Sequence, residues 1–156
     1  MKRAAVVLAF FGFLLVFCFG IAVAQEKATR EECVAKCKEA AALIKEIGVE
    51  AALAKMQDPK GPFVWKDSYV YAADLEGKML AHPFAPGLVG KALRGLKDTN
   101  GKMFGSEIVD IANNKGEGWV EYLWMKPDEK TPSRKATYVY RVPGQPMYVA
   151  AGIYED

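Results

Sequence analysis

The sequence contains a single histidine, His82, and only three cysteines. One imidazole is too few for a metal centre built on several histidines, and it leaves no second histidine to act as a catalytic base. A glycine-rich phosphate loop and a Gly-x-Ser-x-Gly nucleophile motif are also missing from the sequence. We therefore expect a protein that is not an enzyme and that uses no metal and no cofactor.

The chain also lacks an excess of either charge once its first residues are set aside. Lys2 and Arg3 precede an uncharged apolar stretch at 4–24, and the rest of the chain has 19 acidic residues and equally many basic ones. Binding of nucleic acid depends on clustered cations that neutralise phosphates. We therefore expect no nucleic-acid partner.

The apolar stretch has the layout of a secretory signal peptide, with a basic start and small residues just before Gln25. We predict that residues 1–24 are a signal peptide and that residues 25–156 form one domain in the periplasm. An uncleaved membrane anchor is the alternative, because a stretch of this length could span a bilayer. The chain ends at Asp156 without a second apolar span, so a free binding protein is expected.

Cys33 and Cys37 are the two cysteines that follow the predicted signal peptide. They lie four positions apart in a predicted helix, where Cα atoms are about 6 Å apart and a disulfide would be strained. A disulfide and two buried free thiols both fit this spacing.

The spacing of apolar residues changes from a helical period to a strand period near residue 60. Thr29 and Glu32 form a capping-box pattern before a long helix, and Gly48 is expected to separate that helix from a shorter one at 49–56. Alternation of apolar and polar residues then predicts antiparallel strands. We expect strands at 63–65, 69–73, 78–81, 119–124, 135–142 and 147–154, a packed loop at 84–102 and a helix near 104–112. This order predicts an α+β fold in which the long N-terminal helix covers one face of a single sheet.

Aromatic residues near one cation and one imidazole indicate a small-molecule pocket. His82 ends a predicted strand directly before Pro83, which restricts the backbone there. Alternation places Tyr122 and Trp124 on one face of their strand, and Lys135 lies on a later strand. A mostly apolar pocket with a few polar groups is typical of ligand sites. The alternative is an ordinary aromatic core with a solvated lysine at its edge.

An ordered series of residues covers nearly the whole chain after the predicted signal peptide. It comprises Asp58-Pro59-x-Gly61-x-Phe63, Tyr69-Val70-x-x-x-Asp74-x-x-Gly77, His82-Pro83, Gly90-Lys91, Lys97-Asp98-x-x-Gly101-Lys102, Gly118-Trp119-x-x-Tyr122-x-Trp124-x-x-Pro127, Lys135-x-x-Tyr138 and Gly152-Ile153-Tyr154. The series resembles the single Cache sensor domain, which forms the extracytoplasmic sensing part of chemoreceptors and histidine kinases. The resemblance implies a PAS-like antiparallel sheet with a long N-terminal helix packed against it.

The resemblance also implies a pocket between the sheet and residues 84–115 for a short organic acid such as acetate, propionate or pyruvate. The candidate ligand-binding residues carried over are Tyr71, His82, Tyr122, Trp124, Lys135 and Tyr138. His82 and Lys135 would share the carboxylate, and affinity should then fall as the pH rises above the pKa of His82.

The function implied is non-catalytic binding or sensing, as in chemotaxis and signal transduction, with a membrane receptor or a second copy of the chain as partner. The alternative is a protein-interaction or dimerisation module whose pocket is vestigial.

Overall fold

The computed structural model describes residues 26–127 and 129–155, and these form three α-helices, one short 3₁₀ helix and six strands. The helices are α1 (Arg30–Ile47), α2 (Val49–Gln57), η1 (Pro86–Leu88) and α3 (Phe104–Asn114). The strands are β1 (Val64–Trp65), β2 (Ser68–Asp74), β3 (Met79–Ala81), β4 (Glu117–Met125), β5 (Pro132–Arg141) and β6 (Met147–Glu155). Within the described ranges, every helix is too short or too polar to cross a membrane.

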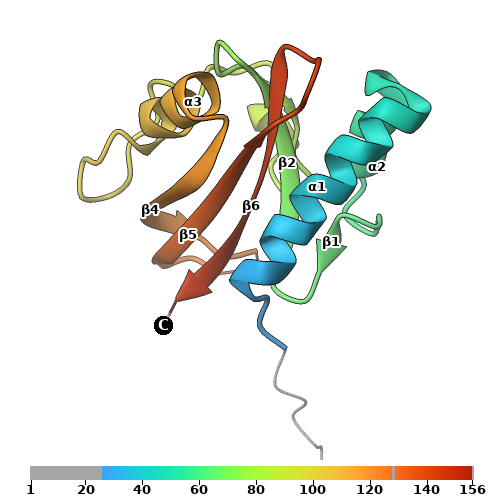
Figure 1. Cartoon of the computed structure of the whole chain (residues 1–156). Helices are drawn as coiled ribbons and strands as arrows, with labels where there is room; N and C mark the ends of the chain where they lie inside the picture. The colour runs from blue at the N-terminus through green and yellow to red at the C-terminus, as the bar shows by residue number, and fades with distance from the viewer. Residues whose placement is uncertain (1–25, 128, 156) are drawn as a thin grey trace, which may run out of the picture.

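The strands form one antiparallel sheet in the order β1-β2-β6-β5-β4. The short strand β3 pairs with the C-terminal part of β2, at Ala72 and Ala73. The C-terminal strand β6 therefore lies in the middle of the sheet, between β2 and β5 (Figure 1). The edge strand β4 pairs with β5 along its whole length. This arrangement confirms the predicted α+β fold with an antiparallel sheet and a long N-terminal helix.

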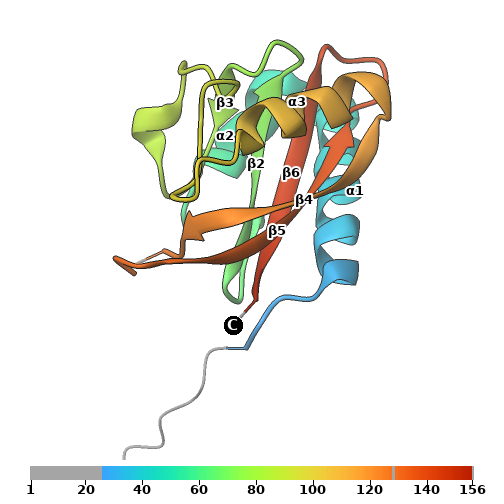
Figure 2. The same ribbon diagram turned by 90° about the vertical axis from the view of Figure 1, so that its left-hand side faces the viewer.

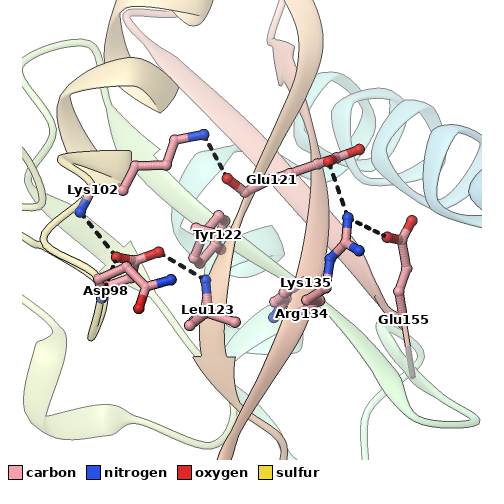
Figure 3. Close-up of a pocket in the computed structure, with 9 residues that line it drawn as sticks. Asp98, Lys102, Glu121, Tyr122, Leu123, Arg134, Lys135 and Glu155 are labelled. Atoms are coloured by element: carbon pink, nitrogen blue, oxygen red, sulfur yellow. Dashed lines mark hydrogen bonds and ion pairs between the residues drawn. The ribbon is translucent and has the colours of Figure 1, made fainter.

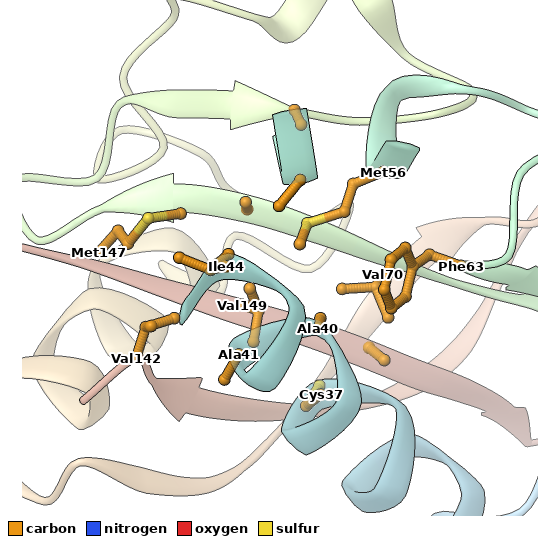
Figure 4. Packing of buried hydrophobic residues seen from close by; sticks show 14 of the residues in the cluster. Cys37, Ala40, Ala41, Ile44, Met56, Phe63, Val70, Val142, Met147 and Val149 are labelled. Atoms are coloured by element: carbon orange, nitrogen blue, oxygen red, sulfur yellow. The ribbon is translucent and has the colours of Figure 1, made fainter. Parts of the chain in front are cut away.

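Helices cover both faces of the sheet, α1 with α2 on one side and α3 with the 82–103 loop on the other (Figure 2). Figure 4 shows the apolar cluster under α1, where Cys37 and Ile44 of the helix pack on Val70 and Val149 of the sheet. Alternate residues of the same strands point to the second cluster under α3. The face under α3 contains most of the polar side chains that are buried in the sheet, as described below.

The start and end of α1 follow from its sequence. Thr29 accepts a hydrogen bond from the Glu32 N–H (3.2 Å), and the Glu32 carboxylate accepts one from the Thr29 N–H (2.9 Å). Gly48 separates α1 from α2 with a φ of 87°, a backbone conformation that other residues rarely adopt. The capping box and the break at Gly48 are both confirmed.

Candidate ligand-binding site

Three side chains form a row across β4, β5 and β6 on the face under α3. Tyr122 lies directly opposite Lys135 in the ladder, and Lys135 lies directly opposite Tyr154. All three residues are buried, and Lys135 is only 2% exposed. The strand ladder therefore places a lysine amine under the helical cover between two phenols.

The Lys135 amine is held by aromatic residues. Its Nζ donates to the hydroxyl oxygens of Tyr69 (2.9 Å) and Tyr154 (3.1 Å). The same nitrogen lies 4.2 Å from the ring centroid of Tyr69 and 4.7 Å from that of Tyr154, within the range of a cation–π contact. Within residues 26–127 and 129–155, no carboxylate forms an ion pair with Lys135. Because a buried charge is stable only when it is compensated, this amine is ready to accept an anion.

His82 follows β3 and is fixed on several sides. The Gln57 side chain bonds both the N–H and the C=O of His82 at 3.0 Å. The ring Nδ1 accepts hydrogen bonds from the backbone N–H groups of Phe84 (3.2 Å) and Ala85 (2.9 Å). With Nδ1 as an acceptor, the neutral ring has its proton on Nε2, so Nε2–H is the free donor of the imidazole.

His82 is neutral in the unliganded protein. Burial, together with the nearby Lys135 charge, lowers the pKa of His82 to about 3. The ring is therefore uncharged at neutral pH in the free protein, and a hydrogen bond from Nε2–H does not require protonation of Nδ1. The fall in acid affinity above the pKa of His82 stays a prediction.

Apolar and aromatic side chains enclose these polar groups. Phe104 of α3 stacks on Tyr122 with ring centroids 4.1 Å apart, and Trp124 meets the Phe104 ring edge-on at 5.4 Å. Burial raises the pKa of Tyr71 and of Tyr122, so both phenols keep their protons and can donate. The cavity is lined by Tyr69, Tyr71, Met79, His82, Leu88, Leu93, Leu96, Phe104, Tyr122, Trp124 and Lys135.

The enclosed volume is small. The cavity holds about 20 Å³, which corresponds to roughly one water molecule. An open cavity of about 280 Å³ borders it and shares Tyr69, His82 and Trp124 with it. These three rings therefore line both cavities.

A second open cavity, of about 430 Å³, lies on the other side of Tyr122 and Lys135 (Figure 3). In Figure 3 the loop before α3 reaches the free edge of β4 on both sides of Tyr122. Asp98 accepts a hydrogen bond from the Leu123 N–H (3.1 Å), and the Lys102 amine donates to the Glu121 C=O (2.6 Å). These side chains occupy backbone groups of the sheet edge, which would otherwise be open to another strand.

The structure brings together Tyr71, His82, Tyr122, Trp124 and Lys135 around one cavity. Tyr138 lies outside it. Residues 135 and 138 are an odd number apart on β5, so their side chains point to opposite faces, and the Tyr138 hydroxyl donates to Glu117 on the α1 side of the sheet.

Sequence reasoning missed Tyr69 and Phe104 as site residues, and it named Tyr154 only as part of an aromatic segment. Tyr154 could have been found from its position on the last predicted strand, next to the strand of Lys135. Tyr69 is 66 positions from Lys135, and the pairing of β2 with β6 that brings them together has no sequence signal.

The two cysteines lie under α1, away from this cavity. Both are free and buried, and Cys33 Sγ is 3.9 Å from Ser68 Oγ. Burial raises the pKa of Cys33 to about 11 and that of Cys37 well above its ordinary value, which keeps both thiols protonated. In the described part of the chain, no three His, Cys, Asp or Glu side chains are grouped as metal ligands would be.

The fold is a helix-covered antiparallel sheet, with a largely aromatic cavity between the sheet and α3. Residues 34–156 match the Cache domain family. The chain belongs to that family.

Its relatives are chemotaxis sensor proteins. The chain is 31% identical over 90 residues to the methyl-accepting chemotaxis protein McpP of Pseudomonas putida, which covers 58% of this chain and 16% of that receptor. The chain thus spans about a sixth of the length of this relative.

Solved structures of the same kind share the fold. A Cache chemosensory domain described for carboxylic acid recognition has a TM-score of 0.72 and 25% identity, over 81% of this chain and 92% of its own. The periplasmic sensor domain of a chemotaxis protein has a TM-score of 0.64 and 29% identity, over 81% of this chain and 90% of its own. A methyl-accepting chemotaxis protein from Vibrio parahaemolyticus has a TM-score of 0.68 and 26% identity, over 81% of this chain and 88% of its own. These similar proteins are sensors rather than enzymes.

Proposed function

We propose that the chain is a periplasmic sensor or binding protein that recognises a short carboxylate such as acetate, propionate or pyruvate, without catalysis. The observation that carries the proposal is the buried Lys135 amine, which has hydroxyl and ring partners but no carboxylate partner in the described residues. A ligand carboxylate would supply the missing negative charge through a charge-assisted hydrogen bond. The His82 Nε2–H would be a second donor.

The lining of the cavity favours an acid over an amino acid. Among the described residues that line it, there is one cation, and none has a carboxylate or an amide side chain. An α-ammonium group would therefore be buried without an acceptor of opposite charge, which is costly. The leucine and aromatic side chains suit a short aliphatic tail.

Binding requires the cover of the cavity to move. A space of about 20 Å³ is filled by roughly one water molecule, so any organic acid must displace neighbouring side chains. Leu88, Leu93 and Leu96 belong to the 82–103 loop, whose backbone hydrogen bonds are mainly turn contacts and form no strand ladder like that of the sheet. We propose that this loop opens to admit the acid.

Isothermal titration of the protein with acetate, propionate, butyrate and pyruvate tests the proposal. At least one acid should bind, while propionamide and alanine should not. Lys135→Met should lose binding by roughly tenfold or more, since a charge-assisted hydrogen bond contributes about 1.5–3 kcal/mol. Lys38→Met, which removes an exposed lysine of α1, is the matched control. Absence of heat with every acid would count against the proposal.

The small enclosed volume also favours a second candidate, an interaction or dimerisation module with a vestigial pocket. That function predicts a stable dimer or complex that does not depend on any acid. Size-exclusion chromatography with light scattering, with and without the acid panel, separates the two.

We further propose that residues 1–24 are a signal peptide, that the domain spans 25–156, and that a membrane receptor is the partner. Mass spectrometry of the exported protein tests the first point, because cleavage before Gln25 and retention of an anchor give different masses.

A further inference from the structure

The Lys135 side chain takes an unusual route through the sheet. Lys135 belongs to β5, but its Nζ donates to Tyr69 of β2, and β6 lies between these two strands. The Lys135 stem therefore leans over β6, and the long Tyr69 side chain covers the rest of the distance between two strands that lie two spacings of about 4.8 Å apart. A side chain on β6 at the crossing point would block this path.

The crossing point is a glycine. Gly152 lies opposite Thr137 in the β5–β6 ladder, and the pair of Lys135 with Tyr154 lies two residues further along. The side-chain position of Gly152 therefore faces the same side of the sheet as Tyr154. A Cβ added at Gly152 would lie 2.7 Å from Lys135 Cε and 2.6 Å from Thr137 Oγ1, both closer than atoms can approach. It would also lie 2.8 Å from the Ala136 carbonyl oxygen.

The backbone does not require glycine at this position. Gly152 is absent from the glycines with positive φ, so alanine could adopt the same conformation. The lack of space above Gly152 is therefore the reason for glycine: the Lys135 stem, the Thr137 hydroxyl and the Ala136 carbonyl oxygen fill it. Thr137 in turn forms a 2.9 Å hydrogen bond with the Tyr122 hydroxyl.

We propose that Gly152 is a positioning residue of the ligand site: the missing side chain lets Lys135 cross β6 and places its amine between Tyr69 and Tyr154. The role of the amine as an anion partner rests on the proposed function. The role of Gly152 in placing the amine rests on the contacts alone.

The binding test uses Gly152→Ala, Lys135→Met and the double variant, titrated with propionate. Gly152→Ala alone should weaken binding by roughly tenfold or more, because the displaced amine loses its charge-assisted contact. In the Lys135→Met background the same change should alter affinity by less than about twofold, since the group through which it acts is gone. Equal losses in both backgrounds would overturn the proposal.

Gly118→Ala is the matched control, a glycine-to-alanine change in the edge strand β4. Its Cβ would lie 3.1 Å from Ile111 and near no atom of Lys135. It should bind propionate as the unchanged protein does.

A measurement without ligand separates failure of this inference from failure of the proposed function. In protein labelled with ¹⁵N-lysine, one slowly exchanging amine signal should disappear in Lys135→Met and thereby be assigned. That signal should be lost or shifted in Gly152→Ala and kept in Gly118→Ala. An unchanged signal in Gly152→Ala would overturn the positioning role even if acids bind. If the signal changes as expected but no acid binds, the positioning role stands and the proposed function is wrong.

Gly152→Ala could also disturb folding. The double variant Lys135→Ala/Gly152→Ala tests whether contact with the lysine stem is the cause. Truncation of the lysine stem removes one of the three close contacts and leaves those with Thr137 Oγ1 and the Ala136 carbonyl oxygen. The double variant should therefore unfold at a higher urea concentration than Gly152→Ala alone. A double variant no more stable than the single one would show that Gly152 serves strand packing, which contradicts the proposal.

Discussion

Replacing Lys135 with methionine should make the unliganded protein more stable and, at the same time, less able to bind an acid. The lysine is 2% exposed and its charge has no carboxylate partner in the described residues. Methionine keeps an unbranched stem of similar length and removes the charge. A change that stabilises the fold and weakens binding is the trade-off expected at a functional site.

The magnitude follows from the partners of the amine. Replacing a buried ion pair by apolar residues is neutral or stabilising by about 1–4 kcal/mol. The Tyr69 hydroxyl loses a donor, which costs about 1 kcal/mol, whereas the Tyr154 hydroxyl keeps its 2.9 Å hydrogen bond to the Met125 carbonyl. We therefore expect a net gain of about 0–3 kcal/mol in the free energy of unfolding.

Urea denaturation without ligand and with saturating propionate measures both effects. The unchanged protein should gain about 2.7 kcal/mol at a ligand concentration one hundred times the dissociation constant, and Lys135→Met should gain little. The difference in stability between the two proteins should therefore shrink or reverse when propionate is added. Lys38→Met should stay within about 0.5 kcal/mol of the unchanged protein. A loss of more than about 1 kcal/mol in unliganded Lys135→Met would refute the reasoning, since the amine would then be a structural support.

Three further predictions concern other residues of the two faces. The pKa of His82 is about 3 in the folded protein, below its ordinary value near 6.5, so the unfolded chain binds more protons between these values. The free energy of unfolding should accordingly fall by up to about 1.4 kcal/mol per unit as the pH drops below about 6.5. His82→Gln should show a shallower decline between pH 6.5 and 4.5 in urea titrations, and equal slopes would contradict a buried neutral imidazole. The buried Tyr148 hydroxyl has no hydrogen-bond partner in the described chain, so Tyr148→Phe should be neutral or stabilise by about 1 kcal/mol in the same assay; a clear loss would reveal a partner. Tyr138→Phe should leave propionate affinity within about twofold, because its side chain lies on the α1 side of the sheet; a larger loss by titration would place it in the site.

The fold was predictable because its elements have strong local signals. The Thr29–Glu32 capping box, the glycine at Gly48 and the alternation in β4 and β5 each determine a boundary or a face from nearby residues. Lys135 and Tyr138 lie an odd number of positions apart on β5, so strand alternation puts them on opposite faces, although the family resemblance grouped them.

The site was predictable only in part, because it depends on contacts between distant segments. Tyr69 reaches Lys135 through the pairing of β2 with β6, and Phe104 reaches Tyr122 through the packing of α3. Neither contact has a periodic signal in the sequence. The reason for Gly152 is likewise visible only when the path of the Lys135 side chain is known.

A crystal structure of the protein grown with propionate tests the central claim most directly. We predict a carboxylate oxygen within hydrogen-bonding distance of Lys135 Nζ, a second contact from His82 Nε2, and the aliphatic tail against the leucines of the 82–103 loop. The account would be contradicted by propionate bound elsewhere while the Lys135 amine stays bonded to Tyr69 and Tyr154 in an unexpanded cavity.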